Sequence, residues 1–181
     1  MTAVAAGALA VVFAMAVAGK VSRPAFTRFR RSAAALWPVP GRLGARPATA
    51  LAAAVLLAEA AVAAGLLLVG IVAPRPVFSA AVLLLAVFTA AQILALRRGR
   101  AVTCACFGRT DTSVSRTGVA RNAVLIALGL LGAVTADRPG TTALSLVCAV
   151  AGGVAGLVVA SLEDIVSLFR IPPVPAKGAG R

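Results

Sequence analysis

Histidine is absent from this sequence of 181 residues, and acidic side chains are scarce, with five aspartates and glutamates in all. The lack of histidine excludes mixed Cys/His zinc sites, histidine proton relays and nucleophile–histidine pairs. Charged residues make up 13% of the chain, whereas about a quarter of a soluble domain is charged. The chain therefore has too few polar side chains to cover a water-soluble core.

Apolar residues make up 61% of the sequence, and the mean hydropathy is +1.01. A membrane-spanning helix needs about 20 mostly apolar residues. Runs of this kind predict an all-α, polytopic transmembrane bundle of about five spans, at residues 3–19, 48–73, 77–96, about 115–136 and about 141–162. Ser115 is a candidate N-cap for the fourth span, and residues 166–181 form a Pro/Gly-rich tail.

Basic residues alternate strongly between the connecting segments. Seven lysines and arginines lie in 20–47 and six in 97–121, but one each in 74–76 and 137–140. The positive-inside rule then places the N-terminus outside and the C-terminus inside, in a cell membrane. Because the net charge of +13 is explained by topology and anionic headgroups, we do not expect nucleic-acid binding. The segment PAFTRFRRSAAALW fits a short amphipathic surface helix with Trp37 at the interface or an irregular basic loop equally well.

Two cysteines, Cys104 and Cys106, stand in the second basic segment as Cys-Ala-Cys-Phe-Gly. A disulfide between cysteines this close would close a small, strained ring. Strain makes a disulfide easier to reduce, which suits a pair that is repeatedly oxidised and reduced. Flanking arginines favour the thiolate, Gly108 permits a sharp turn, and Phe107 could insert its ring into the interface. The motif alone leaves three interpretations open: redox centre, metal ligands or incidental thiols.

A metal site is short of ligands. Cys148, the third cysteine, lies in the fifth predicted span, near the opposite membrane face from Cys104 and Cys106, and its simplest interpretation is a small buried hydrophobe. We therefore predict no metal site. No nucleotide or haem motif is present, and hydrolase or nucleotide-dependent chemistry is not expected. A quinone would fit such a bundle, but nothing in the sequence points to its headgroup, so no cofactor is predicted.

Glu59 is the single acidic residue inside the predicted second span. A carboxylate at that depth is costly without a partner, about 2.5 kcal/mol or more. One interpretation is a structural residue satisfied by Thr89 or Gln92 of the third span. The other is a proton or ligand site. Lys20, which closes the first span, and Arg121-Asn122, which open the fourth, are explained most simply by snorkelling of the two cations to headgroups.

These features occur together in a recognisable order: Ala-Gly-Lys at the end of the first helix, Glu59 in the second, Arg-Arg-Gly-Arg closing the third, then Cys-Ala-Cys-Phe-Gly and Arg-Asn. In this the chain resembles the MauE family of methylamine-utilisation membrane proteins, related to DoxX-like four-helix proteins. The resemblance covers about residues 3–136. It implies a four-helix core at 1–136, and the additional helix predicted at 137–165 lies outside it.

The resemblance implies an accessory role in thiol–disulfide exchange, in maturation of a partner such as methylamine dehydrogenase, alongside a thioredoxin-like protein. Cys104 and Cys106 would be the exchanging pair. The candidates for a binding or structural role are Lys20, Glu59, Gln92, Phe107, Gly108, Arg121 and Asn122. The alternatives are a small-molecule transporter or binding bundle organised around Glu59, and a non-catalytic membrane scaffold. One departure is topological: export-linked disulfide chemistry needs outside thiols, whereas the arginines place Cys104 and Cys106 at the cytoplasmic face.

Overall fold

The computed structural model describes residues 1–36, 44–69, 71–98, 116–136 and 142–169, and for the last helix the side chains from Leu144 to Ser161. These residues form six helices, with no strand among them: α1 (Thr2–Val21), α2 (Arg23–Leu36), α3 (Ala45–Leu67), α4 (Pro74–Arg97), α5 (Arg116–Val134) and α6 (Thr142–Phe169). All except α2 are long and apolar enough to cross a membrane. The predicted all-α bundle of about five spans is confirmed.

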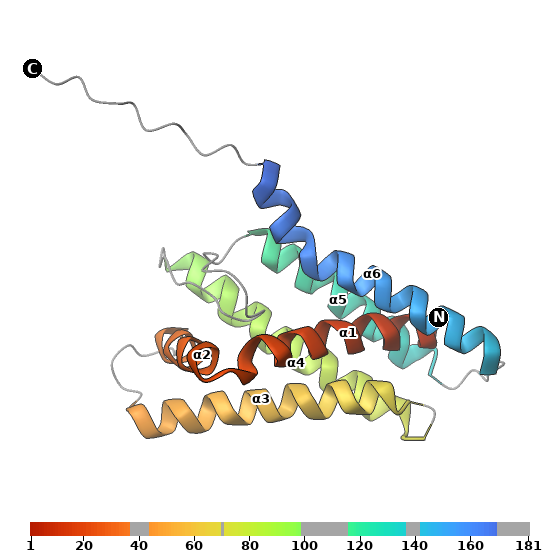
Figure 1. Cartoon of the computed structure of the whole chain (residues 1–181), viewed down its shortest axis with the longest axis horizontal. Coiled ribbons are helices and arrows are strands. Elements are labelled where there is room, and N and C mark those ends of the chain that lie inside the picture. The colour runs from red at the N-terminus through yellow and green to blue at the C-terminus, as the bar shows by residue number, and fades with distance from the viewer. Residues whose placement is uncertain (37–43, 70, 99–115, 137–141, 170–181) are drawn as a thin grey trace, which may run out of the picture.

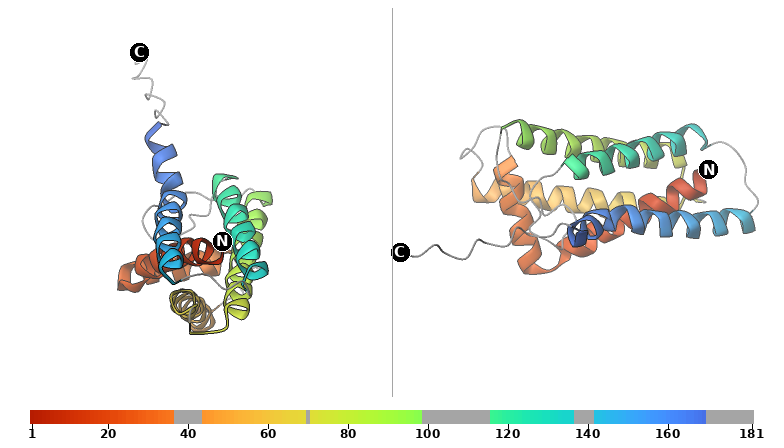
Figure 2. Two further views of the ribbon diagram at one scale, coloured as in Figure 1. Left: turned by 90° about the vertical axis from the view of Figure 1, so that its right-hand side faces the viewer. Right: turned by 90° about the horizontal axis from the view of Figure 1, so that it is seen from above.

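The five long helices run up and down in one bundle (Figures 1 and 2). The end of α1, the start of α3, the end of α4, the start of α5 and the end of α6 lie at one end, which we call the basic end. The N-terminus, the α3–α4 turn and the start of α6 lie at the other end. A helix satisfies its backbone hydrogen-bonding groups within its own segment, which lets each of these apolar runs cross lipid without leaving a backbone group unpaired.

Local signals explain several helix boundaries. Pro74 occupies the start of α4, where a missing backbone N–H costs nothing. α1 ends at Val21, and Ser22, in an extended conformation, turns the chain into α2. α2 is the amphipathic helix that the sequence left undecided against a loop, and it runs crosswise to α1 and α3 (Figures 1 and 2).

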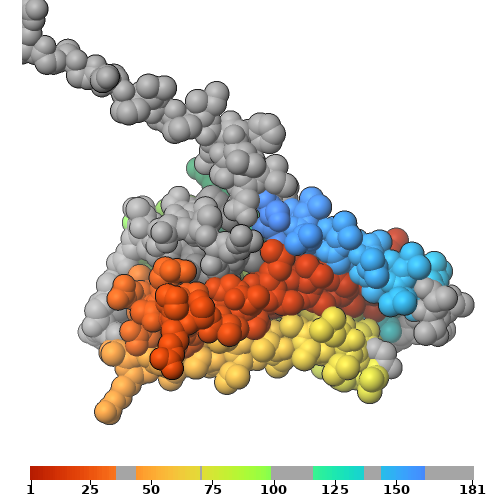
Figure 3. All heavy atoms as spheres, viewed as in Figure 1, coloured from red at the N-terminus to blue at the C-terminus, as the bar shows by residue number. Residues whose placement is uncertain are grey.

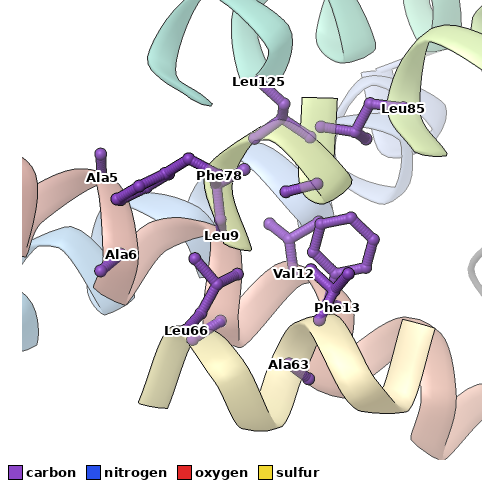
Figure 4. Packing of buried hydrophobic residues seen from close by; sticks show 13 residues of the cluster. Ala5, Ala6, Leu9, Val12, Phe13, Ala63, Leu66, Phe78, Leu85 and Leu125 are labelled. Carbon is purple, nitrogen blue, oxygen red and sulfur yellow. The ribbon is translucent and has the colours of Figure 1, made fainter. Parts of the chain in front are cut away.

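α1 is the central helix of the bundle. It packs against α3, α5 and α6, and in the space-filling view it lies between α3 and α6 (Figure 3). The core gathers side chains of α1 with those of α3, α4 and α5, among them Leu9, Phe13, Phe78 and Leu125 (Figure 4). α6 contributes little to this core and exposes most of its span, as expected of a lipid-facing helix.

α1 and α6 touch through their backbones, at glycines. A Cβ on Gly152 would lie 2.8 Å from the Cα of Val4, and one on Gly156 would lie 2.8 Å from the Cα of Ala8. On the α1 side, a Cβ on Gly7 would lie 3.0 Å from the Cα of Ala149. Small residues allow such close approach, which is how helices gain packing energy in lipid, where the hydrophobic effect between them is absent.

Candidate functional site

A buried ion pair joins α1 to α3. Lys20, in the last turn of α1, donates from Nζ to both carboxylate oxygens of Glu59, at 2.7 and 2.9 Å. The side chains are 0% and 1% exposed. Charges in an apolar interior are tolerated when they are paired and hydrogen-bonded. Lys20 and Glu59 therefore each provide the opposite charge that allows the other to be buried within the bundle.

The partner of Glu59 differs from those considered from the sequence. Thr89 donates its hydroxyl to the carbonyl of Leu85 in its own helix, at 2.6 Å, and Gln92 bonds to another side chain. Snorkelling is likewise wrong for Lys20, since the ammonium turns inward to Glu59. A lysine and a glutamate each alone in an apolar run were the signal for this pairing, because each is costly without an opposite charge.

Phe29 covers the ion pair from α2. The ammonium of Lys20 lies 5.0 Å from the centre of the Phe29 ring, a cation–π geometry. Phe29 itself is 4% exposed, and Ala25, one helical turn earlier, is buried with it. The sequence analysis missed this residue. α2 therefore closes the site as well as running across the bundle.

A second buried polar pair joins α4 to α5. Asn122 donates from Nδ2 to Oε1 of Gln92 at 3.5 Å, a long bond, and both side chains are buried. Oδ1 of Asn122 has no hydrogen-bond partner. Arg121 is also buried, at 4% exposure, so snorkelling to solvent is wrong for it too.

A small cavity separates the two polar pairs. Its volume is about 10 Å³, about enough for a single water molecule. It is lined by Val12, Phe13, Ala16, Glu59, Leu85, Phe88 and Asn122. This volume does not accommodate a small-molecule substrate beside Glu59 in this conformation.

The Gln92–Asn122 contact should be weak. Interhelical hydrogen bonds in membrane proteins contribute about 0.6 kcal/mol on average, and this one is long. We expect a double-mutant cycle of Gln92→Leu and Asn122→Leu, followed by unfolding in detergent, to give a coupling of about 0.5 kcal/mol. A coupling above about 2 kcal/mol would show that the two amides belong to a stronger network.

Five residues singled out from the sequence are thus buried in the interior of the bundle: Lys20, Glu59, Gln92, Arg121 and Asn122. The other four, Cys104, Cys106, Phe107 and Gly108, lie outside the described residues. Their segment follows Arg98, the C-cap residue of α4, and precedes Arg116, the first residue of α5. Gln92 and Asn122 are each six residues from those points, or about 9 Å along a helix.

The described residues hold no group of three or more His, Cys, Asp or Glu placed to bind a metal ion. Cys148 is a free, half-buried thiol in the second turn of α6. The start of α6 lies at the bundle end opposite the ends of α4 and α5 that flank the Cys104–Cys106 segment (Figure 1).

The model of the family described as methylamine utilisation protein MauE matches residues 1–135. The chain belongs to the MauE family. With its five apolar helices, this MauE-family chain is a multi-pass membrane protein. No curated protein and no solved structure matches it. The matched region includes both polar pairs and ends before α6.

Proposed function

We propose that this MauE-family protein is an accessory in thiol–disulfide exchange, with Cys104 and Cys106 as the exchanging pair and a thioredoxin-like dithiol protein as partner. Membership of the family carries the proposal, since the match runs through the Cys-Ala-Cys-Phe-Gly motif. The family is described by its role in methylamine utilisation, so the proteins of that process are the first candidates for the protein whose disulfides are exchanged.

The exchange needs no cofactor. A thiolate of the partner attacks one sulfur of the Cys104–Cys106 disulfide and forms a mixed disulfide, and the second partner thiol then resolves it. The partner loses two electrons and two protons and gains a disulfide, and the cysteine pair gains the two thiols. The reverse sequence oxidises Cys104 and Cys106 and reduces the partner. Both directions balance between the two proteins alone.

We further propose that the basic end faces the cytoplasm. The ends of α1, α4 and α6 and the starts of α3 and α5 share that end, and the arginine-rich segments 20–47 and 97–121 connect there. Positive charge is retained on the cytoplasmic side during insertion. In this orientation the Cys104–Cys106 segment meets cytoplasmic thiols, so its natural role is to receive or deliver reducing equivalents at that face.

In this proposal the Lys20–Glu59 pair is the anchor of the bundle. Its carboxylate is bound at both oxygens, and the adjoining cavity is too small for a substrate. Both observations count against a transporter organised around Glu59. If transport were the function, Glu59→Gln would abolish activity while a variant lacking both Cys104 and Cys106 kept it.

Thiol trapping tests the proposal, with Cys148 as the built-in control. In cells, free thiols are blocked with maleimide, and disulfides are then reduced and labelled with a heavier maleimide. We expect a fraction of the protein to gain two heavy labels, unchanged by Cys148→Ala and lost in Cys104→Ser. We expect the remaining Cys106 of that variant to hold a partner in a mixed disulfide that reductant releases.

A pair found fully reduced under all growth conditions, together with full function of Cys104→Ser and Cys106→Ser, would remove the thiol–disulfide proposal. The side of the membrane is read from a membrane-impermeant maleimide. It should label Cys104 and Cys106 in inverted vesicles and leave them unlabelled in intact cells.

A further inference from the structure

α2 separates its charges from its apolar side chains. The 3.6-residue repeat puts Ala25 and Phe29 on one face, and both are buried against the bundle. Arg23, Arg28 and Arg31 are exposed. Arg30 donates to the Thr49 hydroxyl of α3 at 3.2 Å, which fixes α2 on its neighbour. One face of α2 is thus taken by the protein, and the arginine face is left outward.

The direction of α2 matches a membrane surface. The long helices cross the bilayer, and α2 runs across them at the level where α3 begins and α4 ends (Figures 1 and 2). A helix that runs crosswise to the spans lies along the membrane surface. Its arginines are therefore held at the depth of the headgroups, the usual position of interfacial amphipathic helices.

The protein offers these arginines no carboxylate among its described side chains. Residues 1–58 contain seven lysines and arginines and no aspartate or glutamate. Glu59 is the one acidic side chain that the structure describes, and it is bound to Lys20. Exposed arginines of α3, α4 and α5 add to the charge at the same end, namely Arg46, Arg97, Arg98 and Arg116. Within the described part of the chain, therefore, no acidic side chain neutralises these arginines.

We propose that α2 is a docking surface for anionic phospholipids, whose headgroup phosphates bind Arg23, Arg28 and Arg31. Guanidinium groups form paired hydrogen bonds with phosphate oxygens. Each arginine close to an anionic bilayer strengthens attraction about fivefold. A lipid bound there lies beside the helix that covers the Lys20–Glu59 pair through Phe29. This inference does not depend on the chemistry of Cys104 and Cys106.

Trp37, the single tryptophan of the chain, follows α2 directly in sequence and serves as the probe. The full chain is reconstituted in phosphatidylcholine vesicles that contain either brominated phosphatidylglycerol or brominated phosphatidylcholine, and quenching of Trp37 is measured. We expect brominated phosphatidylglycerol to be preferred by on the order of tenfold. The preference should fall with salt.

Substitutions test whether the arginines of α2 cause the preference for phosphatidylglycerol. Changing Arg23, Arg28 and Arg31 together to glutamine should remove most of it, and changing the same three to lysine should retain it. Arg75→Gln, at the opposite end of the bundle, is the control and should leave it unchanged.

Equal quenching by the two brominated lipids in the unaltered protein overturns the proposal and favours an acidic protein as the occupant. A preference that survives the triple glutamine change assigns the lipid to other arginines and also overturns it. Loss of the preference in millimolar inorganic phosphate, at constant ionic strength, identifies a free-phosphate site instead.

Discussion

Replacing Lys20 with methionine should destabilise the protein strongly, because it leaves the carboxylate of Glu59 buried without its cation. Removing one member of a buried ion pair typically costs about 3–5 kcal/mol. For a chain of this length, that corresponds to a fall in the melting temperature on the order of 10 °C. Thermal unfolding of the purified protein in a mild detergent, followed by size-exclusion fluorescence, measures it. Glu59→Leu should have a comparable effect.

The double variant Lys20→Met/Glu59→Leu is the decisive comparison. It removes both charges at once, and apolar replacements of buried ion pairs are often neutral or even stabilising. We expect it to recover most of the stability lost by either single change. Additive losses in the double variant would contradict an ion pair and would mean that the two side chains act independently.

The second large effect should come from Gly152→Ala. The new methyl group would lie 2.8 Å from the Cα of Val4, and since that atom is backbone, only separation of α1 and α6 relieves the clash. Overpacking of this kind costs about 1–3 kcal/mol, a fall of about 5 °C in melting temperature. The same measurement serves.

Gly153→Ala is the matched control, because it makes the same change at the next residue. There the Cβ would meet Cγ2 of Val11 at 3.2 Å, the end of a side chain that can shift slightly. We expect little loss of stability. Equal effects at Gly152 and Gly153 would show that the helix propensity or lipid exposure of α6, and not its backbone contact with α1, sets the result.

The helical fold was predictable because each span is a long apolar run that can be recognised in the sequence. The residues of the site were predictable for a related reason: Glu59 and Gln92 are polar where polarity is expensive. The pairing of these polar residues was harder to predict. The choice between Thr89, Gln92 and Lys20 as partner of Glu59 depends on the rotation and depth of α1 against α3, which no local pattern encodes.

The role of Phe29 could not be predicted from the sequence either. In the sequence it is one apolar residue in a basic segment, and an amphipathic helix explains it fully. Its contact with Lys20 arises only after α1 ends at Val21 and the chain turns into α2. The backbone contact at Gly152 was similarly hidden, since alanine-rich helices offer many small residues and only the packed pair selects one face.

The central place of α1 has a consequence for biosynthesis. Its charge is neutralised early, because Glu59 follows Lys20 after 39 residues and both can enter the bilayer as a helical hairpin. The face of α1 that contains Gly7 is covered later. Its partner there is α6, the last of the helices described, which is synthesised more than a hundred residues after Gly7. Until then that face of α1 is bare to lipid or to an insertion factor. The first of the described helices is therefore the last to be enclosed, and variants at this contact should accumulate to lower levels in cells than the unaltered protein.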